Sequence, residues 1–268
     1  MANPYLNDKA LQAAGHAGWA APDPSTRATP IDDGPISTWH GGTMTVGGTA
    51  TATGVLLVLL LAAAAVGWRA GPDRTAEATG FPALAIVGVL VGFACAIAVH
   101  FRPMWAKVLG PVYALAEGFF VGVISKAYEN YQHGIVIQAA GATLAVFVVM
   151  LVLYRTQIIK VTERFRRIVI GATMGLMVFY LASFVIRLVA GAGSVSFLSS
   201  PSLLGIGFSV LVAGLAAMNL ALDFDFIERA AKSHQPKGLE WFAAFGLLIT
   251  IVWLYLEILR LLSKLNRR

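Results

Sequence analysis

Four acidic residues of this chain lie deep in strongly apolar segments or just beyond their C-terminal ends, where ionisable side chains are rare. They are Glu117, Asp223, Asp225 and Glu257. An ionised side chain in a lipid-embedded helix costs about 2.5–3.5 kcal/mol on insertion scales, so each of these carboxyls is a candidate functional group. Carboxylate oxygens can bind a proton, and they are also suitable ligands for a hard cation such as calcium. These residue types therefore predict proton or cation binding inside a membrane.

Each carboxyl also has a structural interpretation. Glu117 can be protonated, can pair with a basic group or can line a water-filled cavity, and a structural hydrogen bond explains it equally well. Asp223 and Asp225 point about 200° apart around a helix, so they do not share a face, and an acid at a helix end is usually solvated. Glu257 has Arg260 three residues further on the same helical face, so a local ion pair is the simple alternative.

The other reactive residue types do not form a catalytic pattern. The five histidines lie in the N-terminal tail, at segment ends or in connections: His16, His40, His100, His133 and His234. There is no His-Glu-x-x-His zinc motif, and no lysine lies in the middle of the last apolar segment, where a retinal protein needs one. The single Cys95 lies in an apolar run and is expected to be a packing residue. We therefore expect neither enzymatic activity nor a bound cofactor.

The composition requires a membrane-embedded fold to position these residues. The 268 residues are 57% hydrophobic and 13% charged, with a mean hydropathy of +0.73. Soluble domains are about 45–50% apolar and about 25% charged. The composition excludes a disordered protein, a disulfide scaffold and an ordinary cytosolic enzyme. The net charge of +6 is interpreted as basic cytoplasmic loops rather than as a nucleic-acid-binding surface.

Seven apolar segments are long enough to cross a bilayer, which needs roughly 20 such residues. We expect an all-α polytopic membrane protein in which residues 49–268 form one seven-helix transmembrane domain. Residues 1–48, rich in Gly, Pro and Thr, are expected to be a flexible cytoplasmic tail. The expected spans cover residues 50–68, 81–101, 105–126, 134–154, 168–190, 202–222 and 239–262.

Basic residues predict the orientation, and glycines predict helix contacts. With the N-terminus inside, the cytoplasmic segments carry 12 of the 20 Lys and Arg residues, and the stretch 160–167 is the densest. We expect a multi-pass membrane protein with a cytoplasmic N-terminus. Glycine pairs four residues apart allow backbones to approach closely. Such pairs occur at positions 88 and 92, 118 and 122, and 171 and 175.

Three sequence features together carry a resemblance to a known family. Arg102 lies eleven residues before a Tyr-Ala pair at 113–114, residues 219–228 read Asn-Leu-Ala-Leu-Asp-Phe-Asp-Phe-Ile-Glu, and residues 254–262 read Leu-Tyr-Leu-Glu-Ile-Leu-Arg-Leu-Leu. They are similar, in order, to the second and third spans, the sixth-span ending and the last-span Leu-Tyr-Leu-Asp signature of the Bax inhibitor family. The chain resembles a bacterial form of these transmembrane Bax inhibitor motif proteins from about residue 50 to its C-terminus.

The resemblance implies a central last helix wrapped by the other six, and a pH-sensitive calcium leak. In that family two carboxylates, one from each of the last two helices, share a proton, and an arginine at the end of the second helix bridges them. By position these residues match Asp223, Glu257 and Arg102. Two adjacent carboxylates cannot both ionise at low cost, so loss of the proton would select between two helix packings. The deprotonated oxygens would offer ligands to calcium in transit.

This chain departs from the family pattern at the second acid. Glu257 stands where the family has an aspartate, and it follows Asp223 by 34 residues, a longer interval than the family's. If the last helix enters the membrane at its first apolar residue, Glu257 lies about 27 Å beyond that point, whereas Asp223 lies about 10–15 Å from its own helix end. The two carboxyls then lie at different depths. Glu257 would pair with Arg260 or Glu117, and Asp223 would keep Arg102.

Two kinds of function are compatible with these residues. The leading hypothesis is a passive conduit for calcium or other cations, gated by Asp223, Glu257 and Arg102, with Glu117 as an acid in the pore. The alternative is a non-conducting regulator that binds a membrane protein or protease through its loops and tail; a proton-coupled transporter would use the same acids. Glu117 facing a central cavity favours conduction, whereas Glu117 in a sealed helix contact favours the regulator. The expected partners are bilayer lipid and cations, and not nucleic acid.

Overall fold

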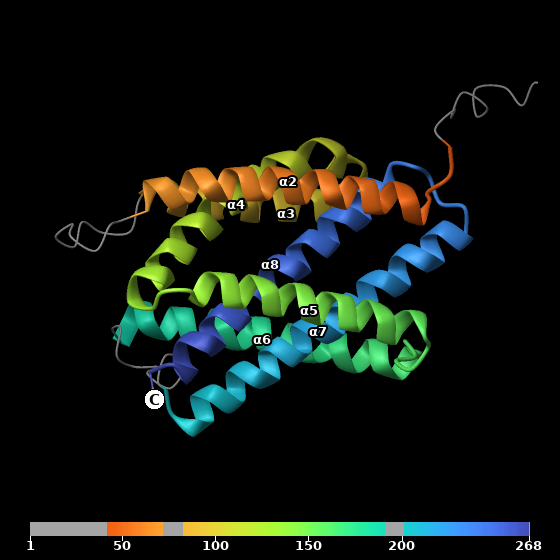
Figure 1. The fold of residues 1–268 in the computed structure, drawn as a ribbon. Helices are drawn as coiled ribbons and strands as arrows, with labels where there is room; N and C mark the ends of the chain where they lie inside the picture. Colours follow the sequence, from red (N-terminus) through yellow and green to blue (C-terminus); the bar gives the residue numbers. More distant parts are fainter. Residues whose placement is uncertain (1–41, 72–82, 191–200, 268) are drawn as a thin grey trace, which may run out of the picture. The chain divides into compact units, whose positions relative to one another are not determined.

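Seven helices make up the described part of the chain (Figure 1). The structure is a computed structural model that describes residues 42–71, 83–190 and 201–267. The helices are α2 (Val46–Ala70), α3 (Ala83–Phe101), α4 (Ala106–Tyr131), α5 (Ile135–Arg155), α6 (Glu163–Ala190), α7 (Leu203–Lys232) and α8 (Leu239–Leu265). A short 3-10 helix, η2 (Pro103–Trp105), leads into α4.

The predicted all-α polytopic class is confirmed, and each expected span coincides with a helix. Six of the helices in the described residues are long and apolar enough to cross a membrane, and the described apolar stretch of α3, Ala85–Phe101, is shorter. α7 continues ten residues beyond its expected end at position 222. α2 begins at Val46, slightly before the expected start of the transmembrane domain. Residues 1–41 of the predicted tail lie outside the described residues.

α8 lies at the centre of the helices, as the family resemblance implied (Figure 1). It contacts α2, α4, α5 and α7, whereas α3 packs mainly on α4 and α6 mainly on α7. Apolar side chains leave α8 in two directions: Leu248 and Val252 pack with α2 and α4, while Leu254 and Ile258 pack with α5 and α7. The central position follows from this apolar surface on more than one side, which is typical of a helix surrounded by others.

Two glycines of α4 allow close contact with α2, as the sequence predicts. A Cβ atom added to Gly118 would overlap the backbone carbonyl oxygen of Leu60, and one added to Gly122 would overlap that of Ala64. Only glycine permits this distance between the two backbones. The close contact between α2 and α4 therefore depends directly on these positions.

The glycine prediction is also correct for α3 but wrong for α6. A Cβ added to Gly88 would lie 2.7 Å from the carbonyl oxygen of Ala116, so α3 approaches α4 closely. Around Gly171 and Gly175 an added Cβ would meet no atom within 4 Å. These two glycines point away from the neighbouring helices, because α6 uses a different face for its contacts.

The segment before α2 is attached to the turn between α7 and α8. Residues 233–238 form this turn, and the end of the bundle where it lies is called the hairpin end below. The N–H of Met44 donates to the carbonyl of Gln235 at 2.7 Å. The buried carboxylate of Glu240 accepts from the N–H and the hydroxyl of Thr45, at 2.9 and 3.0 Å. A negative group at the N-terminus of α2 is favoured by the helix dipole, so these bonds hold the starts of α2 and α8 together.

Replacing Gly122 by Ala is expected to lower the thermal unfolding midpoint of the purified protein in detergent. The added methyl overlaps the backbone of α2, and overpacking costs about 1–3 kcal/mol. A loss of 1 kcal/mol lowers the midpoint by about 2–4 °C in a chain of this size. Gly175→Ala, where an added Cβ meets nothing within 4 Å, is the matched control and should unfold at or slightly above the wild-type temperature. Equal midpoints for all three proteins would contradict the close α2–α4 contact.

Candidate functional site

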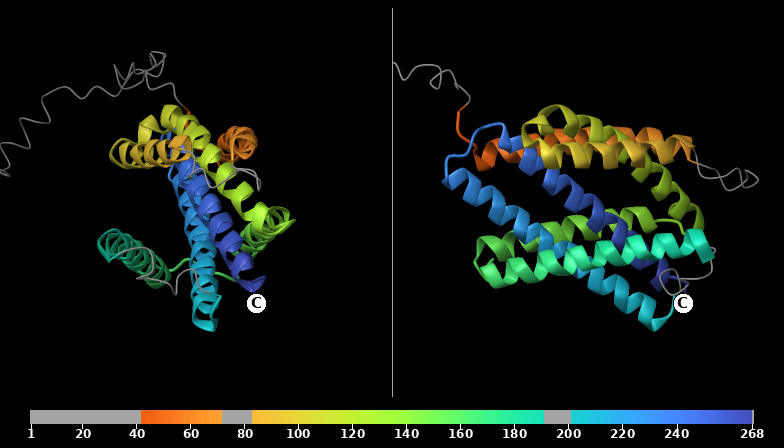
Figure 2. Two further views of the ribbon diagram at one scale, coloured as in Figure 1. Left: turned by 90° about the vertical axis from the view of Figure 1, so that its left-hand side faces the viewer. Right: turned by 180° about the vertical axis from the view of Figure 1, so that it is seen from behind.

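A cavity of about 420 Å³ lies near the hairpin end, between α3 and α6, and α7 and α8 form the rest of its wall. Figure 2 shows α3 and α6 standing apart, and in its left-hand view α7 and α8 lie beside the gap that separates them. The lining from α8 consists of apolar residues and Gly246. The polar residues that line the cavity come from the other three helices: His100, Arg166, Asn219, Asp223 and Arg229.

Asp223 is the acid that lines this cavity, and its side chain is half-buried. Its Oδ2 atom is buried and has no hydrogen-bond partner among the described residues, and no other described side-chain oxygen or nitrogen is in this condition. The Thr250 hydroxyl of α8 faces the carboxyl and also donates to the carbonyl of Gly246 at 3.2 Å. Buried polar atoms are normally hydrogen-bonded, so an exception needs an explanation. A free carboxyl oxygen beside a cavity is suited to binding a proton or a cation.

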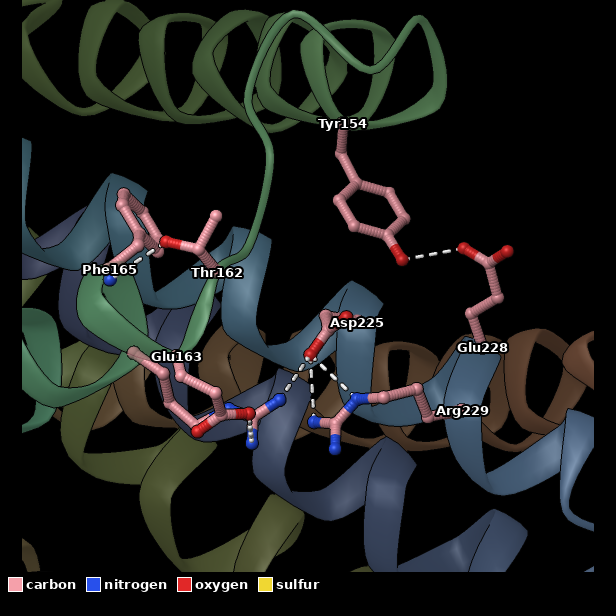
Figure 3. A network of polar contacts seen from close by, with 8 residues as sticks. Tyr154, Thr162, Glu163, Phe165, Asp225, Glu228 and Arg229 are labelled. Carbon is pink, nitrogen blue, oxygen red and sulfur yellow. Dashed lines mark hydrogen bonds and ion pairs between the residues drawn. The ribbon is translucent and has the colours of Figure 1, made fainter.

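Two arginines on the cavity wall are held by Asp225 rather than by Asp223 (Figure 3). Arg166 and Arg229 donate to the same oxygen of Asp225, at 3.1 and 2.8 Å. Arg166 also donates to Glu163 at 2.9 Å. The formal charges of these two arginines and two acids cancel. Asp223 therefore receives no compensating ion pair from this network.

The structure does not bring Arg102 to Asp223. The Arg102 side chain is exposed at the turn between α3 and η2, and it is not among the residues that line the cavity. Within the described ranges it forms no side-chain hydrogen bond or ion pair. His100, two residues earlier, lines the cavity instead. Arg102 therefore does not take the bridging position that the resemblance implied, because the chain turns away from the cavity after α3 ends.

Glu257 and Asp223 are not paired either. Thr250, which faces Asp223, precedes Glu257 by seven residues, about 10 Å along α8 at 1.5 Å per residue. Glu257 is 2% exposed and accepts from Arg260 at 2.9 Å and from the Tyr180 hydroxyl at 3.1 Å. The local pair with Arg260, which the sequence left open, is the arrangement found.

The register of the α7–α8 hairpin explains why the two acids lie apart. The turn at 233–238 is short, so Asp223 lies opposite Thr250. Near the other end of the hairpin, Lys264 donates to Ser209 at 2.8 Å. Contacts at both ends hold the two helices in this antiparallel register. α8 would have to slide by about two turns to bring the second acid level with the first.

Glu117 lies in the contact between α3 and α4. A Cβ added to Gly92 of α3 would be 3.0 Å from Glu117 Oε2 and 3.5 Å from the ring of Tyr113. The Glu117 side chain is half-buried, and it does not line the Asp223 cavity. By the criterion set out from the sequence, this position in a helix contact disfavours a pore-lining role.

The predicted calcium ligands do not form a preformed metal site. Across residues 42–71, 83–190 and 201–267, no group of three or more His, Cys, Asp or Glu side chains could hold a metal ion. Asp223 and Glu257 lie at different levels of α7 and α8, as described above. Cys95 is buried in an apolar cluster with α2, α4 and α8, as expected for a packing residue.

Three cavity residues were not found from the sequence. Asn219 appeared only as part of a family-like stretch, and Arg166 only as part of a basic loop. Arg229 carried a usable signal, because it follows Asp225 by four residues on a helix, the spacing of a local ion pair. The approach of Arg166 to the same acid joins α6 to α7, and that contact has no local signal.

The fold and the cavity together define the class: a multi-pass all-α membrane protein with a central last helix and a half-buried acid beside a cavity. Residues 3–267 match the family described as Bax inhibitor 1 like, and the chain belongs to that family. The family resemblance inferred from the sequence is therefore confirmed. Proteins of this family are generally not enzymes. A comparison with curated proteins gives no match.

Replacing Arg260 by Leu is expected to lower the free energy of unfolding in detergent by about 3 kcal/mol, because it leaves Glu257 buried without its cation. Adding Glu257→Gln should restore part of the loss, since a neutral amide tolerates burial better than an unpaired carboxylate. Arg164→Leu, at an exposed position, is the control and should change stability little. Additive effects of the two substitutions would contradict the pair.

Proposed function

We propose that this protein passively conducts calcium or other cations across a membrane, and that protonation of Asp223 controls conduction. The observation that carries the proposal is the buried, unpartnered Oδ2 atom of Asp223 beside a cavity of about 420 Å³. An acid already held in an ion pair would have to break that pair before it could bind a cation, and Asp223 has no such pair with any residue that the structure describes. Membership of the family supports a Bax inhibitor-like membrane protein, and this carboxyl adds the reason for conduction.

The charges around the cavity support Asp223 as the group that changes state. α3 contributes His100, α6 contributes Arg166, α7 contributes Arg229, and the lining residues of α8 carry no ionisable group. Both arginines are already bonded to Asp225. Deprotonation of Asp223 therefore adds a negative charge that no neighbouring ion pair cancels. Oxygen ligands of this kind suit hard cations such as calcium.

Gating by one proton requires two helix packings that differ by a few kcal/mol. α8 contacts four helices, but α3 and α6 on the two sides of the cavity each pack mainly on one neighbour. The sides of the cavity are thus better suited to move than its centre. In this proposal Asp223 acts without sharing its proton with Glu257. Glu257 contributes carboxylate oxygens further along α8.

The proposed location is a bacterial inner membrane, with the hairpin end in the cytoplasm. The hairpin end carries the dense basic stretch at 160–167 and the basic residues at the end of α7 and in the turn after it. Cytoplasmic loops of membrane proteins are rich in Lys and Arg. In this orientation the Asp223 cavity lies on the cytoplasmic side and reports cytoplasmic pH.

The second candidate function is a non-conducting regulator that binds a partner membrane protein or protease. The position of Glu117 against Gly92 in the α3–α4 contact favours it, because this acid then serves packing and not a pore. The two functions differ in one measurable property. A regulator of this kind produces no cation flux when it is reconstituted alone.

Calcium entry into liposomes loaded with a calcium dye is expected to be faster at about pH 8 than at about pH 6, because deprotonated Asp223 attracts cations into the cavity. Asp223→Asn carries no charge at either pH, so its flux should be low and independent of pH. A pH dependence that persists in Asp223→Asn and disappears in His100→Gln would assign the titration to His100. Wild-type flux no higher than in empty liposomes would refute conduction and favour the regulator.

Filling the cavity should block the flux without unfolding the protein. Gly246 lines the cavity, and a Cβ added there meets no atom within 4 Å, so Gly246→Leu places an apolar side chain in open space. We expect at least a tenfold loss of flux with an unchanged unfolding midpoint. Gly175→Leu, which also meets no atom within 4 Å but lies on α6 outside the cavity lining, should conduct like wild type. Equal flux from both variants would show that cations do not use this cavity.

A further inference from the structure

One face of α6 carries a polar side chain at every seventh position. Arg166, Thr173 and Tyr180 are separated by seven residues each, so they lie in one row along the helix. Each contacts α7 or α8: Arg166 bonds to Asp225 at 3.1 Å, Thr173 accepts from Asn219 at 2.9 Å, and Tyr180 donates to Glu257 at 3.1 Å. We call this row the polar seam of α6.

The polar seam forms part of a narrow interface. Val169 and Leu176 are buried between the seam residues and Ser183 is buried just beyond Tyr180, whereas Met174 and Met177 on the other faces are 57% and 61% exposed. Only 17% of the central α6 residues are buried, compared with 61% for α8. α6 is therefore attached by a single stripe in which polar and apolar residues alternate.

The polar seam begins at the Asp223 cavity and continues toward the opposite end of the helices. Arg166 and Asn219 both line the cavity, and Asn219 donates to Thr173, the next seam residue. From Arg166 to Tyr180 the seam covers about 21 Å at 1.5 Å per residue. Tyr180 contacts Glu257 of α8. Lys264, which is bonded to Ser209, follows Glu257 by seven residues and so extends the row of polar groups by about 10 Å along α8. The total is close to the roughly 30 Å thickness of the hydrocarbon layer.

We infer that the ion path runs along the polar seam, between α6 and the hairpin of α7 and α8. The inference rests on the proposed conduction and names its route. Carboxylate, amide and hydroxyl oxygens lie along this route, and they are the ligands that a hard cation prefers. Three positive side chains also lie along it, Arg166, Arg260 and Lys264, and each is bonded to an acid or to oxygen atoms of α7. The contact of α2 with α4 offers no comparable route, because backbone atoms meet there at Gly118 and Gly122.

The far end of the polar seam is closed by a contact that α6 can release at low cost. The Tyr180 hydroxyl donates to Glu257 and accepts from Arg260 at 3.0 Å, and the guanidinium lies 5.7 Å from the centre of the Tyr180 ring. Glu257 and Arg260 are both on α8, so their ion pair persists when α6 moves away. Opening at Tyr180 thus leaves no buried charge without a partner.

Thiol labelling distinguishes a hydrated path from a dry structural contact. In a Cys95→Ala background, Thr173→Cys places a thiol in the polar seam, and Met177→Cys places one on an outward face of the same helix. In liposomes, we expect a water-soluble methanethiosulfonate reagent to modify Thr173→Cys about tenfold faster than Met177→Cys. The reaction requires a thiolate in water, and an outward face of α6 lies in lipid. Modification of Thr173→Cys should also block calcium flux. Ser183→Cys, buried in the same stripe, replaces Thr173→Cys if that variant does not fold.

The outcomes separate the route from the proposed function. Fast labelling that blocks the flux supports the route. Two results would overturn the route and leave conduction intact, provided that the unlabelled variant conducts. One is equal labelling rates at Thr173→Cys and Met177→Cys, and the other is labelling of Thr173→Cys that leaves the flux unchanged. Absence of flux in wild type overturns conduction itself, and the route falls with it.

Discussion

Helices inside a bilayer gain little from burying apolar surface against one another, because lipid is as apolar as a neighbouring helix. Close backbone contact and interhelical hydrogen bonds must therefore hold them together, and this protein uses the two in different places. α2 and α4 are held by backbone contact at Gly118 and Gly122. α6 instead is attached to α7 and α8 by the polar seam. The contact between α2 and α4 is consequently filled by backbone atoms, whereas the contact of α6 with α7 and α8 contains polar side chains.

The Asp223 cavity lies where the polar side begins. Its two sides are α3 and α6, which each have one main neighbour, and its lining holds a carboxyl oxygen that has no hydrogen-bond partner in the described part of the chain. The proposed conduction and its proposed route both rest on this arrangement. A half-buried acid beside helices that each have one main neighbour can bind a proton or a cation, and the resulting change of charge can alter how the helices pack. The α8 centre provides the fixed frame against which such a change occurs.

Local sequence patterns predicted the helices and several contacts correctly. The apolar segments marked all seven helices, because spanning lipid requires long apolar runs. The i,i+3 spacing offered the Glu257–Arg260 pair as the alternative to the pairing with Asp223, and the structure has this local pair, since neighbours on a helix meet whatever the fold. The glycine spacing was correct at 118 and 122 but wrong at 171 and 175. A glycine pair leaves a helix face without side chains, and the spacing alone does not determine whether another helix packs against that face.

The sequence by itself determined the class, the family and the residue types available for chemistry: a seven-helix membrane protein of the Bax inhibitor 1 like family with a few buried acids. Only the tertiary structure decided which of those acids meet. It separated Asp223 from Glu257, left Arg102 outside the cavity, placed Glu117 between α3 and α4, and brought Arg166 to Asp225. The physical reason is that helix register and rotation depend on contacts between residues far apart in the chain, and a shift of two turns moves a side chain by about 10 Å.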